Sequence, residues 1–439
     1  VSVINANSVT RVNGNLSDAL SVATEVANSD PAISGLTTAR FSLSDEAAVS
    51  VADVLTLSTF TSGSVLALQV PTFQGTSAQI GDISSAGTLL GEIATGQIGT
   101  SSAFEIQISI PGGSSTSATT AELEALVPPL AGVTVDATAY TAVAGTDADI
   151  EDIITEGKVI LDGDYTVDLT NSSISASDMA VIIGDTSGAI DATDVTTLTG
   201  NVSDVSAVLA ARSGQISNLA NVNVTFDNQS ANATLAANDV LTTEGGIGSG
   251  TVTASSSNFT ATATNLGTFA DAIAASSISI GTNAAVDVTG NASVANIVKM
   301  DAETGGVITA TVSEQDTATL KTLTGSNALT ITVATGNEAA TDLTAVSSKT
   351  TVDVIANAVT GISGDAADIN AVLASDSGIS LDGDFTVAVN DPASVASVNG
   401  YKAATSGAIS ASVSDNASNL TGLNTTGSDS INVIVSWTN

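Results

Sequence analysis

The sequence predicts an α/β fold, namely a repeat solenoid of short helix plus parallel β-strand units, preceded by a β-rich N-terminal region. The first observation is a strand-like alternation of apolar residues that recurs about every 22–24 residues through the last third of the chain. The second is a short amphipathic stretch between successive alternating segments, and the third is a near-repeat of whole segments at distant positions. A helix between every two strands at this short period implies parallel strands, because each helix then serves as the crossover.

The first 110 residues show alternation with few helical patterns. Val65–Val70 and Phe104–Ile110 alternate between apolar and polar side chains, as half-buried strands do. The segment over residues 111–120 reads PGGSSTSATT, which is the composition of a flexible polar linker. The sequence therefore predicts a β-rich N-terminal domain or cap over 1–110, a linker after it, and solenoid repeats over 121–439.

The repeat region contains the clearest strands and helices. The apolar positions of its predicted strands are Ile308/Ala310/Val312, Leu329/Ile331/Val333, Val352/Val354, Phe385/Val387/Val389, Ile409/Ala411/Val413 and Ile431/Val433/Val435. Between them, polar starts followed by apolar residues three or four positions apart predict helices of about two turns. Asp365–Ala374 is one such helix. Asp391 and Pro392 are expected to open another, as its N-cap and first helical residue.

Two parts of the repeat region match each other over both helix and strand. The sequence DIEDII at 149–154 leads to LDGDYTV at 161–167, and DINAVLA at 368–374 leads to LDGDFTV at 381–387. A third segment, DVSAVLAARSG at 204–214, repeats the helix of the later copy. Matches of this specificity indicate a repeated structural unit.

Each LDGD segment places two carboxylates in one turn. The aspartates concerned are Asp162, Asp164, Asp382 and Asp384. Such a turn can direct carboxylate and backbone oxygens at Ca²⁺, which takes about six to eight oxygen ligands. The alternative is a plain polar turn, in which Gly supplies positive φ and Asp makes local hydrogen bonds. The four aspartates are therefore candidate calcium ligands, and Ca²⁺ is a candidate cofactor.

Composition excludes several classes of function. The 439-residue chain has no Cys, no His, 8 Lys+Arg against 45 Asp+Glu, and a formal net charge of −37. The eight cationic residues lie singly along the sequence, so no basic patch for nucleic acid is expected. An anionic membrane surface would repel the chain, and no run is long and apolar enough to span a bilayer. The acidity favours solubility or the gathering of divalent cations.

The residue inventory also argues against catalysis. Without His and Cys there is no Ser/His or Cys/His nucleophile system and no thiolate metal site. Two carboxylates could hydrolyse a glycosidic bond, but sugar sites usually stack rings on aromatic side chains, which make up only 3% of this chain. We expect no enzyme activity, no catalytic residue and no site for an organic cofactor.

The units DINAVLA, LDGDFTV and ATSGAI resemble the repeat regions of large secreted cell-surface proteins of marine bacteria and cyanobacteria. The resemblance covers roughly residues 145–439 and includes proteins of the S-layer, matrix-fibre and adhesin types. It implies an extracellular or cell-surface location and a structural role, often with calcium.

We therefore expect a secreted structural protein that self-assembles into an extracellular filament or a surface layer. One alternative is a calcium-stabilised adhesin or stalk that presents a binding surface. Another is a polysaccharide-active enzyme. The expected partners are further copies of the chain, joined head to tail, and surface polysaccharide.

The head-to-tail prediction depends on strand-like segments near both ends of the sequence. An unguarded terminal strand is a template for pairing with another chain, and a contact between two different surfaces generates a filament when it does not close. The predicted assembly residues are Val3, Ile4, Ile431, Val433, Val435 and Trp437.

Overall fold

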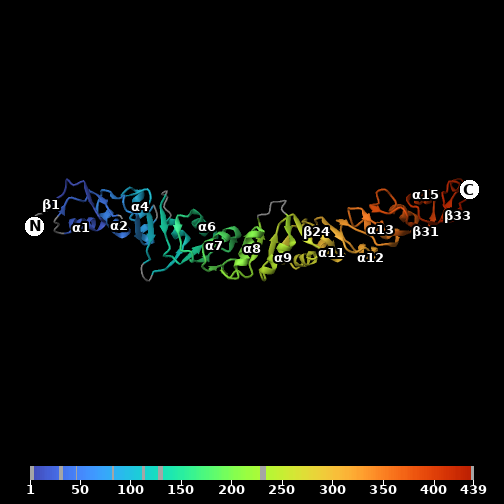
Figure 1. The fold of residues 1–439 in the computed structure, drawn as a ribbon, viewed down its shortest axis with the longest axis horizontal. Coiled ribbons are helices and arrows are strands. Elements are labelled where there is room, and N and C mark those ends of the chain that lie inside the picture. Colours follow the sequence, from blue (N-terminus) through green and yellow to red (C-terminus); the bar gives the residue numbers. More distant parts are fainter. Residues whose placement is uncertain are drawn as a thin grey trace. The chain divides into compact units, whose positions relative to one another are not determined.

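The computed structural model gives this protein an α/β fold. It describes residues 4–28, 33–45, 47–81, 84–110, 114–126, 132–227 and 234–436. Across these residues 16 helices alternate with short strands, and the strands pair in parallel (Figure 1). The predicted fold class is confirmed at this level. The chain forms two compact units, Val1–Asn223 and Val224–Asn439.

The first unit alternates helices with short strands along its length. Its helices are α1 (Leu16–Ala27), α2 (Val51–Phe60), α3 (Ser77–Ile80), α4 (Leu89–Ala94), α5 (Thr120–Ala125), α6 (Asp147–Glu156), α7 (Ala176–Asp185) and α8 (Val202–Ala211). Its strands are β1 (Ile4–Asn5), β2 (Arg11–Gly14), β3 (Ile33–Ser34), β4 (Arg40–Leu43), β5 (Val49–Ser50), β6 (Val65–Ala67), β7 (Thr72–Gly75), β8 (Ile98–Thr100), β9 (Glu105–Ile108), β10 (Ser117–Thr119), β11 (Thr134–Asp136), β12 (Ala142–Gly145), β13 (Val159–Ile160), β14 (Thr166–Leu169), β15 (Ser173–Ser175), β16 (Ile190–Asp191), β17 (Thr197–Gly200) and β18 (Ile216–Ser217). The strand orders are β1-β3, β2-β4-β6-β8, β5-β7-β9-β11-β13, β10-β12-β14-β16-β18 and β15-β17.

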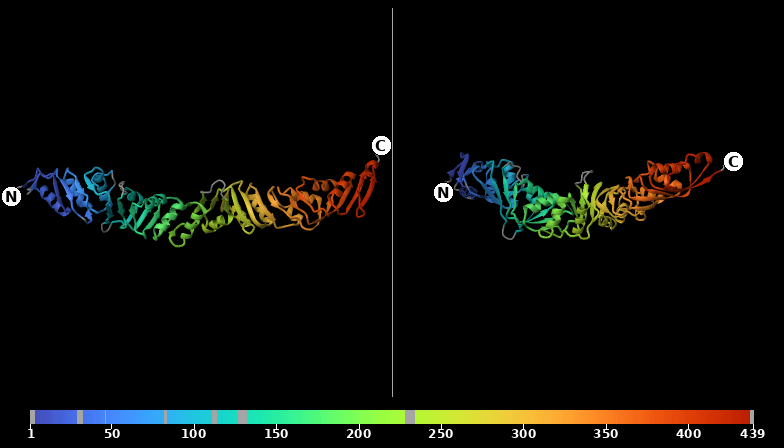
Figure 2. Two further views of the ribbon diagram at one scale, coloured as in Figure 1. Left: turned by 45° about the horizontal axis from the view of Figure 1, so that its top comes forward. Right: turned by 45° about the vertical axis from the view of Figure 1, so that its right-hand side comes forward.

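The second unit has the same alternation. Its helices are α9 (Ala237–Gly246), α10 (Leu266–Ala274), α11 (Val294–Glu303), α12 (Thr317–Leu320), α13 (Ala340–Ser347), α14 (Ala366–Val372), α15 (Val395–Ala404) and α16 (Ala417–Leu420). Its strands are β19 (Asn223–Phe226), β20 (Thr234–Ala236), β21 (Val252–Ala254), β22 (Asn258–Thr262), β23 (Ile278–Ile280), β24 (Ala285–Ala292), β25 (Ile308–Val312), β26 (Ala328–Thr330), β27 (Gly336–Ala339), β28 (Val354–Ile355), β29 (Val359–Gly364), β30 (Ile379–Ser380), β31 (Thr386–Ala393), β32 (Ile409–Asp415) and β33 (Ser430–Val435). The strand orders are β19-β21-β23, β20-β22-β24-β25-β26, β27-β29-β31-β32-β33 and β28-β30. Figure 2 shows the helices and strands of this unit, coloured yellow-green to red, from two further sides.

Parallel pairing places equivalent positions of neighbouring strands in rows, and the buried rows form the core. Val143, Val167 and Ile190 make one such row across β12, β14 and β16, and all three are buried. Val387 on β31 and Ile409 on β32 make another. Because side chains alternate between the two faces of a strand, each short strand gives the core one or two residues, and β-branched side chains suit that position.

Strands occur in all six predicted segments of the repeat region, but four of the predicted residues lie outside the strand bounds: Ile331, Val333, Val352 and Phe385. Strands β25, β26, β31, β32 and β33 lie in the predicted alternating segments. In the Val352/Val354 segment, Val354 is buried in β28, whereas Val352 lies before the strand and is 43% exposed. A two-residue strand has room for only one inward position.

The helix expected at Asp391 and Pro392 is wrong in its start. Both residues lie at the end of β31, where the pairing with β32 shifts register between Ala388 and Pro392. Proline is tolerated at such an irregularity because no ladder hydrogen bond is needed there. Helix α15 begins at Val395 behind the N-cap Ser394.

The first 110 residues contain helices α1 to α4, so they are not distinguished by a lack of helix. Helix α1 buries Leu16, Ala19 and Ala23, at the three- and four-residue spacing of an amphipathic helix. Sheet pairing also continues past the predicted linker, because β9 pairs with β7 before it and with β11 after it. Strand β10 and the first residue of α5 lie inside residues 111–120.

None of the helices in the described part of the chain is long and apolar enough to cross a membrane.

Candidate functional site

The two Asp-Gly-Asp turns share one geometry. Asp162 Oδ1 accepts a hydrogen bond from Gly163 N at 2.9 Å, and Asp382 Oδ1 accepts one from Gly383 N at 2.8 Å. All four predicted calcium ligands are exposed: Asp162, Asp164, Asp382 and Asp384. Each turn therefore presents two carboxylates to solvent and uses one of them in part to fix its own backbone.

A cation at either turn would find two carboxylates. Among the residues described, no three acidic side chains come together as a metal-binding group. Because Ca²⁺ takes about six to eight oxygen ligands, most of its ligands at such a turn would be water or backbone oxygens. Calcium binding by the four aspartates stays a prediction.

The backbone of the first turn is held by a Thr-x-Gly segment that follows helix α7. Thr186, the C-cap of α7, donates from Oγ1 to Tyr165 O at 2.5 Å and accepts from Gly188 N at 2.9 Å. Ser187 N donates to Gly163 O at 2.8 Å. We term this arrangement the Thr-x-Gly clasp. It connects the end of α7 to the turn that precedes β14.

The clasp recurs with the same atoms at Thr61–Gly63, Thr304–Gly306 and Thr405–Gly407. In these copies the threonine Oγ1 donates to Ala39 O at 2.6 Å, Ala284 O at 2.6 Å and Phe385 O at 2.5 Å. A Cβ on any of the four glycines would lie 2.0–2.6 Å from the same carbonyl oxygens, so only glycine fits. Sequence reasoning missed the clasp, although the recurring Thr-Ser-Gly and Thr-Gly-Gly triplets signal it.

Several other carboxylates cap helices from a distance in sequence. A backbone N–H in the first turn of a helix has no partner within that helix, and the helix dipole favours negative charge there. The acceptors are Asp45 for Leu16 N at 2.9 Å, Glu314 for Val294 N at 2.9 Å, Asp391 for Ala366 N at 2.6 Å and Asp415 for Val395 N at 3.2 Å. Each acid follows the capped residue by 20 to 29 positions. Some of the acidic residues thus stabilise the fold by capping helices.

These hydrogen bonds affect titration. Burial alone would raise the pKa of Glu314, but hydrogen bonds from Ser313 and from Val294 N hold that pKa below its usual value. Hydrogen bonds from Asn419, Asn416 N and Val395 N likewise lower the pKa of Asp415. Both carboxylates therefore stay ionised at neutral pH.

Strand β33 carries three of the predicted assembly residues. Ile431 and Val433 are the register partners of Ala411 and Val413 on β32, which are buried, and Val435 is the next residue on the same face. Val433 is 48% exposed because, within the described residues, β33 pairs with β32 alone. The buried row of the sheet is therefore open at this strand.

The other predicted assembly residues lie near the start of the sequence and at its last residues. Ile4 lies in β1, which pairs with β3, and it is 62% exposed. Val3 and Trp437 lie outside the described residues.

A buried ion pair anchors the start of β33. Lys402 Nζ of α15 lies 3.3 Å from Asp429 Oδ1, and their side chains are only 10% and 1% exposed. Asp429 also accepts from Ile409 N at 2.9 Å and from Thr426 N at 2.6 Å. Burial would raise the pKa of Asp429, but these hydrogen bonds, the Thr426 hydroxyl and Lys402 together lower it to about 2.

Two arginines that lie apart in the sequence meet in the first unit. Arg11 on β2 and Arg40 on β4 are direct register partners, and both are exposed. The two residues lie singly along the sequence but are neighbours across two paired strands. Strand register, which the sequence does not show at this point, brings them together.

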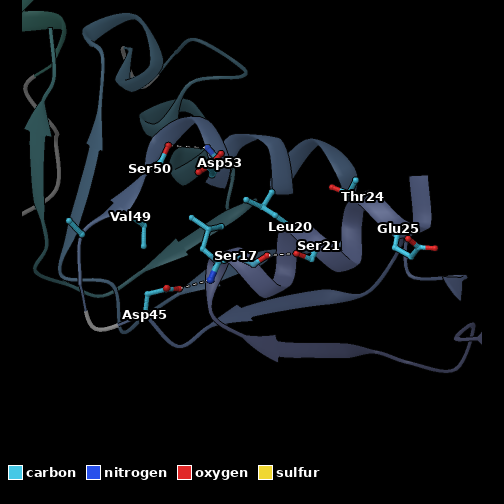
Figure 3. A pocket seen from close by; sticks show the side chains of 11 residues that line it. Ser17, Leu20, Ser21, Thr24, Glu25, Asp45, Val49, Ser50 and Asp53 are labelled. Atoms are coloured by element: carbon cyan, nitrogen blue, oxygen red, sulfur yellow. Dashed lines mark hydrogen bonds between the residues drawn. The ribbon is translucent and has the colours of Figure 1, made fainter. Parts of the chain in front are cut away.

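A groove of about 670 Å³ lies between α1 and α2 (Figure 3). Its acidic residues are Glu25, Asp45 and Asp53, and Asp45 is already engaged with Leu16 N. Its lining contains neither a basic nor an aromatic side chain. The groove therefore offers no nucleophile–base pair and no ring on which a sugar could stack.

Comparisons with protein-family models and with curated proteins find no match for this chain.

Proposed function

We propose that this protein is a secreted, non-catalytic structural protein whose helix–strand units stack as a solenoid and which self-assembles head to tail into an extracellular filament or surface layer. The observation that carries the proposal is β33. Its Ile431, Val433 and Val435 continue the buried side of the sheet into solvent. An apolar row with an open hydrogen-bonding edge is a template for a further strand.

A further strand on β33 would satisfy its free backbone groups and bury its apolar row. Fully burying one Val or Ile side chain is favourable by about 1.5–3 kcal/mol, so a row of three supplies a substantial driving force. Neither Lys nor Pro occurs in Ser430–Val435, and these are residues that commonly block pairing at an edge. The sequence of β33 therefore contains neither of these residues to prevent another strand from pairing with it.

The matching surface that we propose is strand β2 of the first unit. Strand β2 pairs only with β4 among the described residues, and its Val12 is the register partner of the buried Phe41. Ile4 on β1 adds an exposed apolar side chain nearby in sequence. A strand β33 from one copy placed against β2 of another would repeat the parallel pairing used within each unit. This contact joins two different surfaces, so it generates a filament unless it closes.

Composition supports a non-catalytic, extracellular role. The chain lacks His and Cys, and the α1–α2 groove has no basic or aromatic side chain. In the clasps and the distant carboxylate caps, polar side chains form hydrogen bonds between successive helix–strand repeats. Polar residues with such a structural role are expected in a protein that serves as a scaffold.

The test is the state of the purified protein. Sedimentation velocity across a concentration series and negative-stain electron microscopy should show extended polymers of the whole chain. A variant lacking residues 430–439 should remain monomeric with an otherwise native circular dichroism spectrum. A whole chain that stays monomeric and binds a surface target would instead support the adhesin alternative. Polymerisation of the truncated protein would rule out β33 as the contact.

A further inference from the structure

We propose that Arg11 and Arg40 form a binding site for an acidic polysaccharide, whose carboxylate or sulfate groups the two guanidinium groups receive. The site lies on the sheet β2-β4-β6-β8 of the first unit. Arg11 lies on β2, the strand that is proposed to receive β33 of another copy, but the ligand proposed here is a saccharide, which would bind through the two arginine side chains.

The two arginine side chains are held in place by hydroxyl groups. Arg11 Nη2 donates to Ser42 Oγ at 2.8 Å, and Arg40 Nε donates to Ser64 Oγ at 3.1 Å. Each bond uses one N–H of a guanidinium that has five, so most donors of both groups remain for a ligand. A preorganised side chain loses less entropy on binding than a free one.

A hollow of about 390 Å³ accompanies the pair. Its lining consists of the two arginines together with hydroxyl-bearing and glycine residues: Thr10, Arg11, Thr38, Arg40, Gly63 and Ser64. The lining thus has charged donors and hydroxyls but no carboxylate and no large apolar side chain. Gly63 closes a clasp against Ala39, which fixes this side of the lining to the backbone that precedes β4.

The charge surroundings of the pair are unusual for this chain. None of the four strands β2, β4, β6 and β8 contains Asp or Glu, in a protein with 45 acidic residues. In the described part of the chain, the ion pairs found are Lys299–Asp271, Lys321–Asp342 and Lys402–Asp429, and none involves Arg11 or Arg40. Like charges directly opposite on neighbouring strands are destabilising. An anion placed between the two guanidinium groups would offset that cost.

The lining determines the class of ligand. Guanidinium groups bind carboxylate and sulfate oxygens through paired, charge-assisted hydrogen bonds. The hydroxyls of Thr10, Thr38 and Ser64 can exchange hydrogen bonds with sugar hydroxyls. A protein partner would instead be expected to meet some apolar surface, because the centre of a protein interface is usually apolar. The chemistry therefore favours a uronate- or sulfate-bearing sugar chain over a second copy of this protein.

The test measures binding of defined saccharides to the whole chain by isothermal titration calorimetry at low salt. The probes are an oligogalacturonate, a dextran sulfate and neutral dextran. We expect at least one anionic probe to bind, neutral dextran not to bind, and affinity to fall as salt is added. The double variant Arg11→Gln/Arg40→Gln should weaken binding about tenfold or more, a change of about 1.4 kcal/mol or more.

The matched control is Lys158→Gln/Arg212→Gln, which makes the same change in net charge in the same unit. It should leave affinity within about twofold of the unmodified protein, whereas a general charge effect would weaken both variants equally. Circular dichroism establishes that both variants are folded. The proposal is overturned if no anionic probe binds, or if both variants bind equally. It is also overturned if the arginine variant loses self-association in sedimentation while binding saccharide normally, since the occupant would then be a second copy.

Discussion

The Thr-x-Gly clasps show how single residues connect successive helix–strand repeats. In the last clasp, Gly407 N donates to Thr405 Oγ1 at 3.0 Å, and that hydroxyl donates to Phe385 O at 2.5 Å. The sequence shows the triplet but not its partner, because the accepting carbonyl lies 20 residues earlier in the chain. Glycine is required at the third position because the backbone of the preceding repeat lies too close for a Cβ atom. A pattern of hydrophobic residues cannot predict such a contact.

At this scale we predict opposite effects for two glycines of the second unit. In Gly407→Ala the new Cβ would lie 2.0 Å from Phe385 O, so the clasp must open, at a cost of about 1–3 kcal/mol. Gly400 is exposed inside α15 with nothing near its Cβ position, so Gly400→Ala should stabilise the protein by up to about 1 kcal/mol. Urea unfolding followed by circular dichroism measures both. Equal effects of the two substitutions would contradict the role given to the clasp.

Among the elements, strands were easier to predict than helices. The strands of the repeat region follow from a period of two. The described helices span only 4 to 12 residues, so each offers few turns over which a helical period can be recognised. Asp391 illustrates the limit. It does cap a helix, but that helix is α14, which precedes it in the chain, and only the folded structure brings them together.

The element whose position matters most for the proposed function is β33. The contribution to stability of the Lys402–Asp429 ion pair at its start should depend on pH. The pKa of Asp429 is about 2, below its ordinary value of 3.8. The carboxylate therefore contributes stability that is fully present above about pH 4 and is lost as pH falls toward 2. Hydrogen bonds to charged groups contribute about 1.5–3 kcal/mol, so Asp429→Asn should destabilise the protein by about that amount at pH 6.

The measurement is the urea midpoint of Asp429→Asn and of the unmodified protein between pH 6 and pH 2. Their difference should shrink as the pH approaches 2, because the unmodified protein then loses the same charge. Asp376→Asn, at an exposed position of the same unit, serves as the control and should follow the unmodified protein. A difference that stays constant with pH would show that the ion pair does not act through its charge.

For the whole molecule, the net charge of −37 predicts stabilisation by divalent cations. Carboxylates at this density repel one another, and ions that bind the folded chain raise its stability by mass action. Millimolar Ca²⁺ should raise the melting temperature measured by calorimetry, and EDTA should lower it. An identical melting curve in both would exclude stabilisation by calcium.

A pair of variants separates a specific turn site from general charge relief. Asp382→Asn/Asp384→Asn removes both carboxylates of one turn, and Asp287→Asn/Asp376→Asn removes two exposed carboxylates elsewhere in the same unit. If the turn binds calcium, only the first variant should lose part of the calcium-dependent shift. Equal losses would assign the effect to overall charge.

Composition and periodicity together predicted an α/β fold of alternating helices and parallel strands, and the strand at β33. They did not predict the pairing of Arg11 with Arg40, because helix α1 lies between the two positions and only the folded chain sets the register of their strands. They also did not place the acidic residues. Many of these cap helices or fix turns, and only strand register shows which helix each one reaches.

The most direct test of the central claim, assembly through β33, compares two substitutions of exposed valines in the second unit. Val433→Lys places a charge in the open apolar row, and Val307→Lys places one at a valine that is 51% exposed outside β33. Electron microscopy and sedimentation velocity of both variants should be carried out beside the unmodified protein. We predict polymers for the unmodified protein and for Val307→Lys, and monomers for Val433→Lys. Normal polymers of Val433→Lys would contradict assembly through β33 and would place the contact between copies elsewhere on the surface.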